Sequence, residues 1–209
     1  NKEIMIRALI TDFGGVLART RTDRSRRALE DRLGLASGTL ENRVFGGEIS
    51  LLGQRGAISE DEFWQAVARD LDCARIGLTP QAFRTEFFAD DFLDEELVAF
   101  IRSVRPQLKT GLISNAWTGL RDMLHTTVPI ADVFDALVIS AEEKIMKPDP
   151  RIYQLALDRL GVRADESIFL DDFQVNIDAC NALGLHGVHF KSTEQAQRDI
   201  RALLAQAAA

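Results

Sequence analysis

The sequence contains little cysteine and no long apolar run. Its two cysteines in 209 residues, Cys73 and Cys180, are too few for a disulfide framework, and no cluster of cysteine and histidine accompanies them. We expect two unpaired thiols in a reducing cytoplasm. No apolar stretch approaches the roughly 18 residues that a membrane span requires, and the first residues lack the pattern of a signal peptide. We therefore expect a soluble, unexported protein with no membrane partner.

An excess of basic residues is also missing. Lysine and arginine number 25 against 32 aspartate and glutamate residues, so the formal net charge is −7, and the cationic side chains are scattered except at 19–27. We therefore expect no nucleic-acid partner. The motifs Gly-x-x-x-x-Gly-Lys and Gly-x-Gly-x-x-Gly are absent, which excludes the usual nucleotide-binding loops. The 46% of apolar and 27% of charged residues are typical of a globular protein that folds without disulfides.

Five short apolar runs predict buried strands, and helical patterns separate them. The runs are 6–11, 110–114, 136–140, 167–170 and 187–190. One intervening helix is indicated by apolar residues at helical spacing from Ile152 to Leu160, with Gly161 just past its last turn. This alternation predicts an α/β fold in which a Rossmann-like, doubly wound parallel sheet carries helices on both faces.

The first two strands are separated by about ninety residues with helical patterns throughout, far too many for one crossover connection. Ser59 and Glu62 form a capping box, and Thr79 precedes a first-turn proline. Another helix begins at Asp94, and Pro106 ends it. We predict an inserted α-helical cap at 18–100 and a core domain made of residues 1–17 and 101–209.

Polar residues follow the strands at the edge where open parallel sheets bind ligands. One carboxylate after a strand would be an ordinary N-cap or turn residue. Here four polar sites converge on one edge, which predicts a binding site. These sites are Asp12, Ser114 with Asn115, Lys147, and Asp171 with Asp172.

Three carboxylates crowded into a low-dielectric site raise each other's pKa unless a cation compensates them. Mg²⁺ suits a pair of aspartates because it prefers a few hard oxygen ligands, several waters and phosphate oxygens. Ser114, backbone N–H groups at a helix start and Lys147 could then hold a phosphoryl group. Asp12 would be the nucleophile, and water would cleave the resulting aspartyl-phosphate.

Four short motifs, each weak alone, occur in order at the strand ends and cover nearly the whole chain. They are Asp12-Phe13-Gly14-Gly15-Val16-Leu17, Leu112-Ile113-Ser114-Asn115, Lys147-Pro148, and Phe169-Leu170-Asp171-Asp172 with Asn176 four places on. In these motifs the chain resembles the haloacid dehalogenase superfamily, a class dominated by Mg²⁺-dependent phosphatases with a Rossmann-like core and a helical cap.

The resemblance implies a role for each motif residue. Asp12 would be the nucleophile, Ser114 and Asn115 would hold the transferring phosphoryl group, and Lys147 would orient and neutralise it. The magnesium ligands would be Asp12, Asp172 and the backbone carbonyl of Gly14. Asp171 and Asn176 would support this site from behind the metal ligands. The alternatives are that Asp171 is only a helix N-cap and that Asn176 only bonds within its loop.

One residue departs from the family pattern. Most family phosphatases have a second aspartate two residues after the nucleophile as general acid and base, and this chain has Gly14 there. L-2-haloacid dehalogenases lack that acid because halide needs no proton, but they also lack paired aspartates such as Asp171 and Asp172. Certain sugar-phosphate phosphatases, including a bacterial glucose 1-phosphate phosphatase, show a similar glycine. A third alternative is a non-catalytic protein that binds a phosphate ligand.

Two further segments resemble the glucose 1-phosphate phosphatase group and the phosphatase domain of soluble epoxide hydrolases. They are Gly56-Ala57-Ile58-Ser59 followed by Glu62-Phe63-Trp64, and residues 147–153. The anomeric oxygen of a sugar 1-phosphate is a better leaving group than an ordinary alcohol, so it depends less on a protonating acid. We therefore expect a Mg²⁺-dependent phosphomonoester hydrolase whose substrate is a small phosphorylated metabolite, with a sugar 1-phosphate as a candidate. The oligomeric state stays open.

Overall fold

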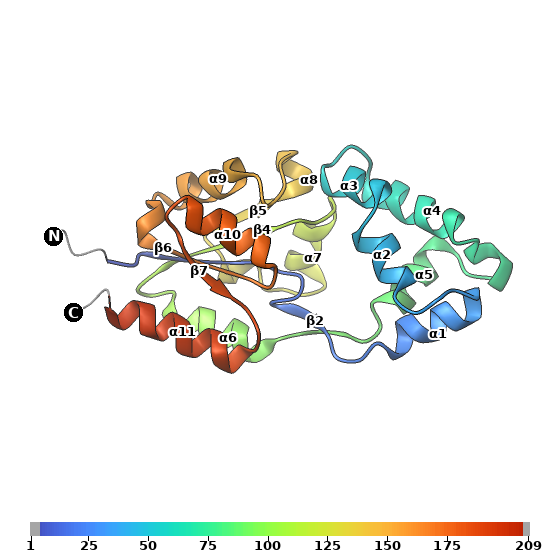
Figure 1. Ribbon diagram of the computed structural model, residues 1–209, viewed down its shortest axis with the longest axis horizontal. Coiled ribbons are helices and arrows are strands. Elements are labelled where there is room, and N and C mark those ends of the chain that lie inside the picture. The colour runs from blue at the N-terminus through green and yellow to red at the C-terminus, as the bar shows by residue number, and fades with distance from the viewer. Residues whose placement is uncertain (1–4, 207–209) are drawn as a thin grey trace.

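The computed structural model describes residues 5–206 and contains a central parallel sheet of five strands (Figure 1). The strand order is β5-β4-β1-β6-β7. Each predicted apolar run forms a strand, and every boundary agrees to within two residues. The strands are β1 (Ala8–Thr11), β4 (Lys109–Ser114), β5 (Ala136–Ile139), β6 (Ser167–Asp171) and β7 (His186–His189). The predicted α/β, doubly wound fold is confirmed.

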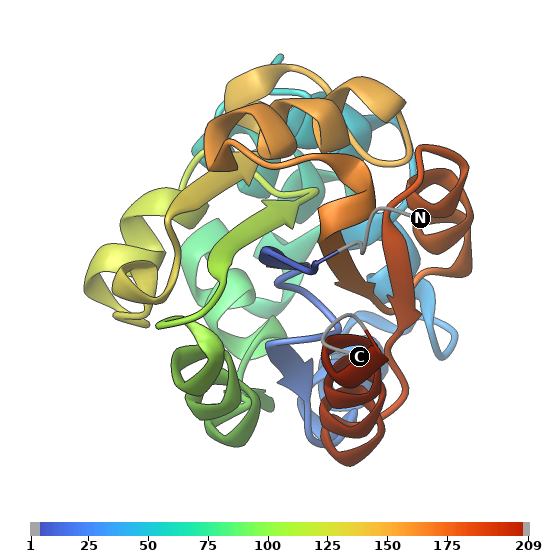
Figure 2. The same cartoon turned by 90° about the vertical axis from the view of Figure 1, so that its left-hand side faces the viewer.

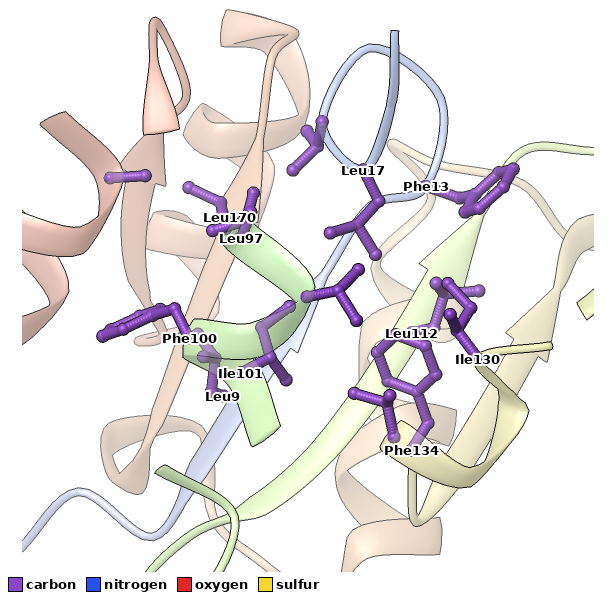
Figure 3. Packing of buried hydrophobic residues seen from close by; sticks show 14 of the residues in the cluster. Leu9, Phe13, Leu17, Leu97, Phe100, Ile101, Leu112, Ile130, Phe134 and Leu170 are labelled. Carbon is purple, nitrogen blue, oxygen red and sulfur yellow. The ribbon is translucent and has the colours of Figure 1, made fainter. Parts of the chain in front are cut away.

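Helices cover both faces of this sheet because alternate strand residues point to opposite sides. Leu9, Leu112 and Leu170 point to one face, where they pack in the cluster drawn in Figure 3. That face is covered by α6 (Glu95–Val104), α7 (Leu120–Thr126) and α11 (Thr193–Gln206). The other face packs on α9 (Pro150–Leu160) and α10 (Gln174–Ala182). Figure 2 shows α9 on one side of the sheet and α6 and α11 on the other.

The insert forms a helical cap with its own apolar core. Ser59 and Glu62 make the predicted capping box, and the Thr79 side chain accepts the N–H of Ala82 at the start of the last cap helix. Phe63, Trp64 and their aromatic neighbours fill the cap interior. The cap helices are α1 (Arg24–Leu33), α2 (Thr39–Phe45), α3 (Glu48–Gln54), α4 (Glu60–Asp70) and α5 (Pro80–Phe87), with a 3₁₀ turn η1 (Cys73–Ile76).

The pattern predicts helix throughout the insert, and the structure corrects this prediction. Two short strands, β2 (Ala18–Thr20) and β3 (Asp91–Leu93), pair antiparallel where the chain enters and leaves the cap. Three-residue strands are too short to show a period in the sequence. The following helix α6 packs Leu97 and Phe100 on the core sheet. We therefore propose 18–94 as the cap, which moves its predicted end from residue 100 to residue 94.

Cys73 lies in the cap and Cys180 in the core, and both are buried and unpaired, as expected. Within residues 5–206, no helix is long and apolar enough to cross a bilayer.

Shorter elements connect the strands of the core: the 3₁₀ turns η2 (Ala131–Val133) and η3 (Ala164–Glu166), and the one-turn helix α8 (Ser140–Glu143).

The core packing yields a first prediction. Leu112 is fully buried in the middle of β4, so Leu112→Ala should lower the free energy of unfolding by about 2–5 kcal/mol, through lost transfer energy and the cavity left behind. Leu52→Ala is the matched control, since Leu52 is 46% exposed and its truncation should change stability by less than about 0.5 kcal/mol. Urea denaturation measures both values. Equal losses would contradict the assignment of the core.

Candidate active site

The sheet topology brings the predicted polar residues to one edge. Strand β1 lies between β4 and β6, all three run parallel, and their carboxyl ends point toward the cap (Figure 1). Asp12 follows β1, Ser114 ends β4 and Asp171 ends β6, and all three side chains are buried. Carboxylate oxygens of Asp12, Asp171 and Asp172 all lie within 4.8 Å of one another. This edge therefore concentrates negative charge in a desolvated place.

Lys147 neutralises part of that charge. Its side chain is 1% exposed, and Nζ lies 2.9 Å from Asp12 Oδ2 and 2.6 Å from Asp171 Oδ2. A buried ammonium ion is stable only when it is paired and hydrogen-bonded, and these two carboxylates meet that need. Since three carboxylates face one lysine, two negative charges stay uncompensated when all of them are ionised.

Asn115 holds the backbone of Lys147 in place. Asn115 Oδ1 accepts the Lys147 N–H at 2.8 Å, and Asn115 Nδ2 donates to the Lys147 carbonyl at 2.9 Å. Both polar atoms of the amide are therefore occupied by the lysine main chain. A contact of Asn115 with a phosphoryl group stays a prediction. In the structure the side chain of Asn115 binds the main chain of Lys147 instead.

Asp171 is the most enclosed carboxylate of the site and is fully buried. Besides Lys147, it accepts the Phe173 N–H at 2.8 Å and the Asn176 amide at 3.0 and 3.1 Å. The carbonyl of Asn176 in turn accepts the hydroxyl of Tyr153 at 3.1 Å. All lone pairs that Asp171 directs into the protein thus have donors, and the carboxylate is available to fix Lys147 rather than to bind a ligand.

Asp172 differs from Asp171 because one of its oxygens has no partner. Oδ1 is buried and accepts no hydrogen bond from any residue in 5–206. Its carboxylate lies against Gly15, where an added Cβ would come within 2.2 Å of Asp172 Oδ2. Gly15 also has φ +77°, a conformation that favours glycine. The glycine therefore lets Asp172 approach the loop that follows Asp12.

Burial dominates the proton affinities of the site. It raises the pKa of Asp12 from 3.8 to about 7, with Asp171 adding to the rise and Lys147 opposing it. Burial also raises the pKa of Asp172, again with help from Asp171. For Lys147, burial by itself would lower the pKa, but Asp12 and Asp171 outweigh it and the pKa is raised. The lysine is thus a permanent cation, while the carboxylates favour a further positive charge.

These properties fit a hard divalent cation. The donor set is all oxygen, its negative charge exceeds that of Lys147, and Asp172 Oδ1 is a buried acceptor without a donor. Asp12 and Asp172 could hold such a cation, and the backbone carbonyl of Gly14 is the third predicted ligand. In the same loop, Gly14 stands at the position of the expected acid. It is exposed, its φ lies outside the left-handed region, and an added Cβ would meet nothing within 4 Å, so the backbone there does not require glycine.

The supporting roles of three residues, Gly15, Tyr153 and His189, are not predicted from the sequence. Gly15 is recognisable only as the second glycine of a pair, and nothing in the pattern shows that Asp172 needs its missing side chain. Tyr153 reads as an apolar helix residue, although its hydroxyl fixes Asn176. His189 Nε2 lies 2.9 Å from the backbone carbonyl of Asp172, a contact that orients the main chain of this loop.

Comparisons with known proteins identify a family and relatives of this chain. A family model described as "haloacid dehalogenase-like hydrolase" matches residues 6–184. The chain is 28% identical to bifunctional epoxide hydrolase 2 of Sus scrofa, over 93% of this chain and 38% of that protein. It is 31% identical to (S)-2-haloacid dehalogenase 1 of Pseudomonas sp., over 65% of this chain and 63% of that protein. The chain therefore spans less than two thirds of the length of these curated relatives.

A solved structure shares the fold. It is a HAD family enzyme of Bacteroides thetaiotaomicron in complex with magnesium and inorganic phosphate, with a TM-score of 0.72 and 20% sequence identity. The alignment covers 89% of this chain and 94% of that chain.

The raised pKa of Asp12 predicts an unusual pH dependence of stability. Without metal, the folded chain keeps a proton on Asp12 up to pH about 7, whereas the unfolded chain releases it near 3.8. This group therefore makes folding less favourable as pH rises through that window. In EDTA, Asp12→Asn should gain in Tm over the wild type when pH is raised from about 5 to about 8.

Asp149→Asn is the control for this titration. The half-buried Asp149 has its pKa lowered to about 2 by hydrogen bonds from Arg151, so it stays ionised throughout that range. Its difference in Tm from the wild type should not change between the two pH values. A Tm difference for Asp12→Asn that is equally flat would show that Asp12 is already ionised at the lower pH.

Proposed function

The chain belongs to the haloacid dehalogenase-like hydrolase family, and from this membership we propose that it is a Mg²⁺-dependent phosphomonoesterase that works through an aspartyl-phosphate on Asp12. The observation that carries the proposal is the buried ion pair of Asp12 and Lys147 beside Asp171 and Asp172. A dianionic phosphate ester needs compensating positive charge at this edge, and one lysine together with a divalent cation supplies it.

Asp12 is the nucleophile in this mechanism. Its Oδ attacks the phosphorus, the bond from phosphorus to the leaving oxygen breaks, and that oxygen departs with the bonding pair. Water then attacks the phosphorus of the aspartyl-phosphate, and inorganic phosphate leaves while the carboxylate is regenerated. The Phe13 N–H donates to Asp12 Oδ1 at 2.7 Å and fixes the rotamer of the carboxylate.

The other residues position and neutralise the transferring group. Lys147 stabilises the charge on the phosphoryl oxygens, and Asp171 with Asn176 holds its ammonium group in place. Ser114 offers a hydroxyl at the carboxyl end of the neighbouring strand. We assign Asn115 a contribution through its backbone N–H, because its side chain is engaged with Lys147.

Asp12, Asp172 and the Gly14 carbonyl would hold Mg²⁺. Bound there, the cation would lower the pKa of Asp12 and neutralise the phosphoryl oxygens. The magnesium and phosphate of the Bacteroides thetaiotaomicron enzyme belong to a protein of the same fold and support this choice of cation and ligand.

Haloacid dehalogenase chemistry is the second candidate. The similarity to (S)-2-haloacid dehalogenase 1 and the absence of an acid at Gly14 favour it, because a departing halide needs no proton. Against it stands Asp172, whose unpartnered buried oxygen adds a negative charge that a metal-free reaction does not use. Halide release that persists in EDTA would identify the dehalogenase, and phosphate binding without turnover would identify a non-catalytic protein.

The substrate class is also part of the proposal. We favour a small phosphorylated metabolite with an acidic leaving group, such as a sugar 1-phosphate, because no side chain at Gly14 protonates the departing oxygen. A cytoplasmic location, in a reducing compartment that keeps Cys73 and Cys180 as thiols, and the absence of a nucleic-acid partner stay predictions.

Mutation of the nucleophile tests the mechanism. Asp12→Asn should abolish the phosphate release that the wild type shows on a panel of phosphorylated metabolites in Mg²⁺. Asp172→Asn should instead require a higher Mg²⁺ concentration for half-maximal rate, since one anionic oxygen is lost. Asp158→Asn, an exposed change on α9, serves as the control with unchanged rate. An Asp12→Asn variant as fast as the wild type would discard the mechanism.

The missing acid yields a prediction about leaving groups. Aryl phosphates and sugar 1-phosphates should react faster than alkyl phosphates and 6-phosphates, since the leaving oxygen must carry more negative charge. Gly14→Asp should speed the alkyl phosphates most, by up to roughly 10² to 10⁴. The φ of Gly14 and the open space around it allow a side chain.

Gly15→Ala is the matched control for Gly14→Asp. Its new Cβ would collide with Asp172, and alanine would have to adopt the left-handed backbone conformation of Gly15. Activity should therefore fall on every substrate alike. Equal wild-type rates for aryl and alkyl phosphates, with chemistry rate-limiting, would show that another group already supplies the proton.

A further inference from the structure

Trp117 joins the core to the cap. It lies in the loop after β4, three residues beyond Ser114, yet its half-buried indole packs against the apolar core of the cap. The ring is stacked on Phe63, with centroids 4.7 Å apart, and on Phe45 at 6.2 Å. Gly53 in α3 makes room for it, because an added Cβ there would lie 2.6 Å from Trp117 Cδ1. A side chain of the core domain thus occupies space that Gly53 of the cap leaves open.

Polar contacts accompany this insertion. The buried Ser140 hydroxyl donates to the carbonyl of Gln54 in the cap at 2.6 Å and accepts the N–H of Ala116 at 3.0 Å. Next to it, Gly56 approaches the Ala141 carbonyl so closely that a Cβ would come within 2.0 Å. Cap and core are therefore in direct contact along one seam, where α3 lies beside α8 (Figure 1).

The cap is attached differently on its other side. There the chain itself connects the two parts through β2 and β3, and Arg19 pairs with Asp94 at the start of α6. Arg19 lies between the rings of Phe92 and Phe190, and Asp94 also accepts the hydroxyl of Thr193. This joint cannot separate without breaking the core packing. The contacts described at the Trp117 seam, by contrast, are non-covalent and join segments that are distant in the chain.

We infer that Trp117 is a positioning residue that latches the cap onto the core and thereby aligns the loop carrying Ser114 and Asn115. A displaced cap would shift Trp117, which is joined to Asn115 through Ala116. Asn115 holds the main chain of Lys147 through two hydrogen bonds, so the displacement reaches the ion pair with Asp12. A shift of about 1 Å at reacting groups can reduce rates up to a hundredfold.

Fluorescence quenching tests the latch without any substrate. The chain has two tryptophans, so Trp64→Phe leaves Trp117 as the single tryptophan, which is excited selectively over Tyr153 at the red edge of the absorption band. In this background the indole should be poorly quenched by acrylamide. Adding Ser140→Ala removes the hydrogen bond across the seam to Gln54, together with the bond from the Ala116 N–H within the core domain. Because one net hydrogen bond across the seam is lost, the Stern–Volmer constant should rise up to about fivefold, the corresponding change in an equilibrium constant.

Ser167→Ala is the control for Ser140→Ala. Ser167 is equally buried and donates to the Arg163 carbonyl at 2.8 Å, but it lies at the amino end of β6, away from the cap. Quenching should stay at the level of the parent. Equal quenching in the two serine variants, or an indole that is freely quenched in the parent, would overturn the latch.

Gly53→Ala provides a second route to an open seam if Ser140→Ala does not fold. Alanine favours the helix by about 1 kcal/mol over glycine, so α3 should persist while the new Cβ displaces the indole. Quenching should rise with Gly53→Ala. Unchanged quenching in this folded variant would also overturn the latch.

Kinetics test the alignment, and this part rests on the proposed phosphatase function. Trp117→Ala should lower kcat about ten- to a hundredfold, whereas Trp117→Phe, which keeps a stacking ring, should recover most of the rate. A purely structural role would lower Tm and leave kcat of the folded fraction unchanged, which would overturn the alignment. Failure of the proposed function is distinct, because the wild type would then release no phosphate.

Discussion

The buried ion pair between Lys147 and two carboxylates is the constraint on which the rest of the site depends. Burying an ammonium group costs too much unless Asp12 and Asp171 both face it, and burying these carboxylates requires the lysine in turn. The topology meets this need because β1 lies between β4 and β6. The excess of negative charge that remains gives the site its affinity for a cation. The arrangement of the buried charges thus accounts both for the position of Lys147 and for the affinity of the site for a cation.

Around this pair, some residues are placed to bind a ligand or metal, and others hold Lys147 in position. Asp171 and Asn115 use their polar atoms within the protein, so they fix Lys147 from its side chain and its backbone. Each Asp12 oxygen has one partner, the Phe13 N–H or Lys147, and Asp172 Oδ1 has none among the described residues, so we assign ligand or metal binding to these two carboxylates. Gly14 leaves open space at the position where most phosphatases of the family have an acid, and the proposed preference for acidic leaving groups rests on this space. The cap, latched through Trp117, joins this arrangement from outside the sheet.

Much of this arrangement could be predicted from the sequence, because buried parallel strands are continuous apolar runs and their polar ends converge. The strands, the helical insert and the grouping of Asp12, Asp171 and Asp172 are examples. Features that depend on contacts distant in sequence could not be predicted. The strands β2 and β3 are too short for a pattern, the partners of Asn115 lie 32 residues away, and the fit of Trp117 against Gly53 exists only in three dimensions.

The most direct test of the account is to trap the covalent intermediate. An acid quench during turnover of an aryl phosphate in Mg²⁺, followed by peptide mass spectrometry, shows which residue carries the phosphoryl group. The account predicts one added phosphoryl group on the peptide that contains Asp12, labile to hydroxylamine as an acyl phosphate must be. A phosphoryl group on another residue, or rapid turnover under Mg²⁺ with no modified peptide in the quenched burst, would contradict it.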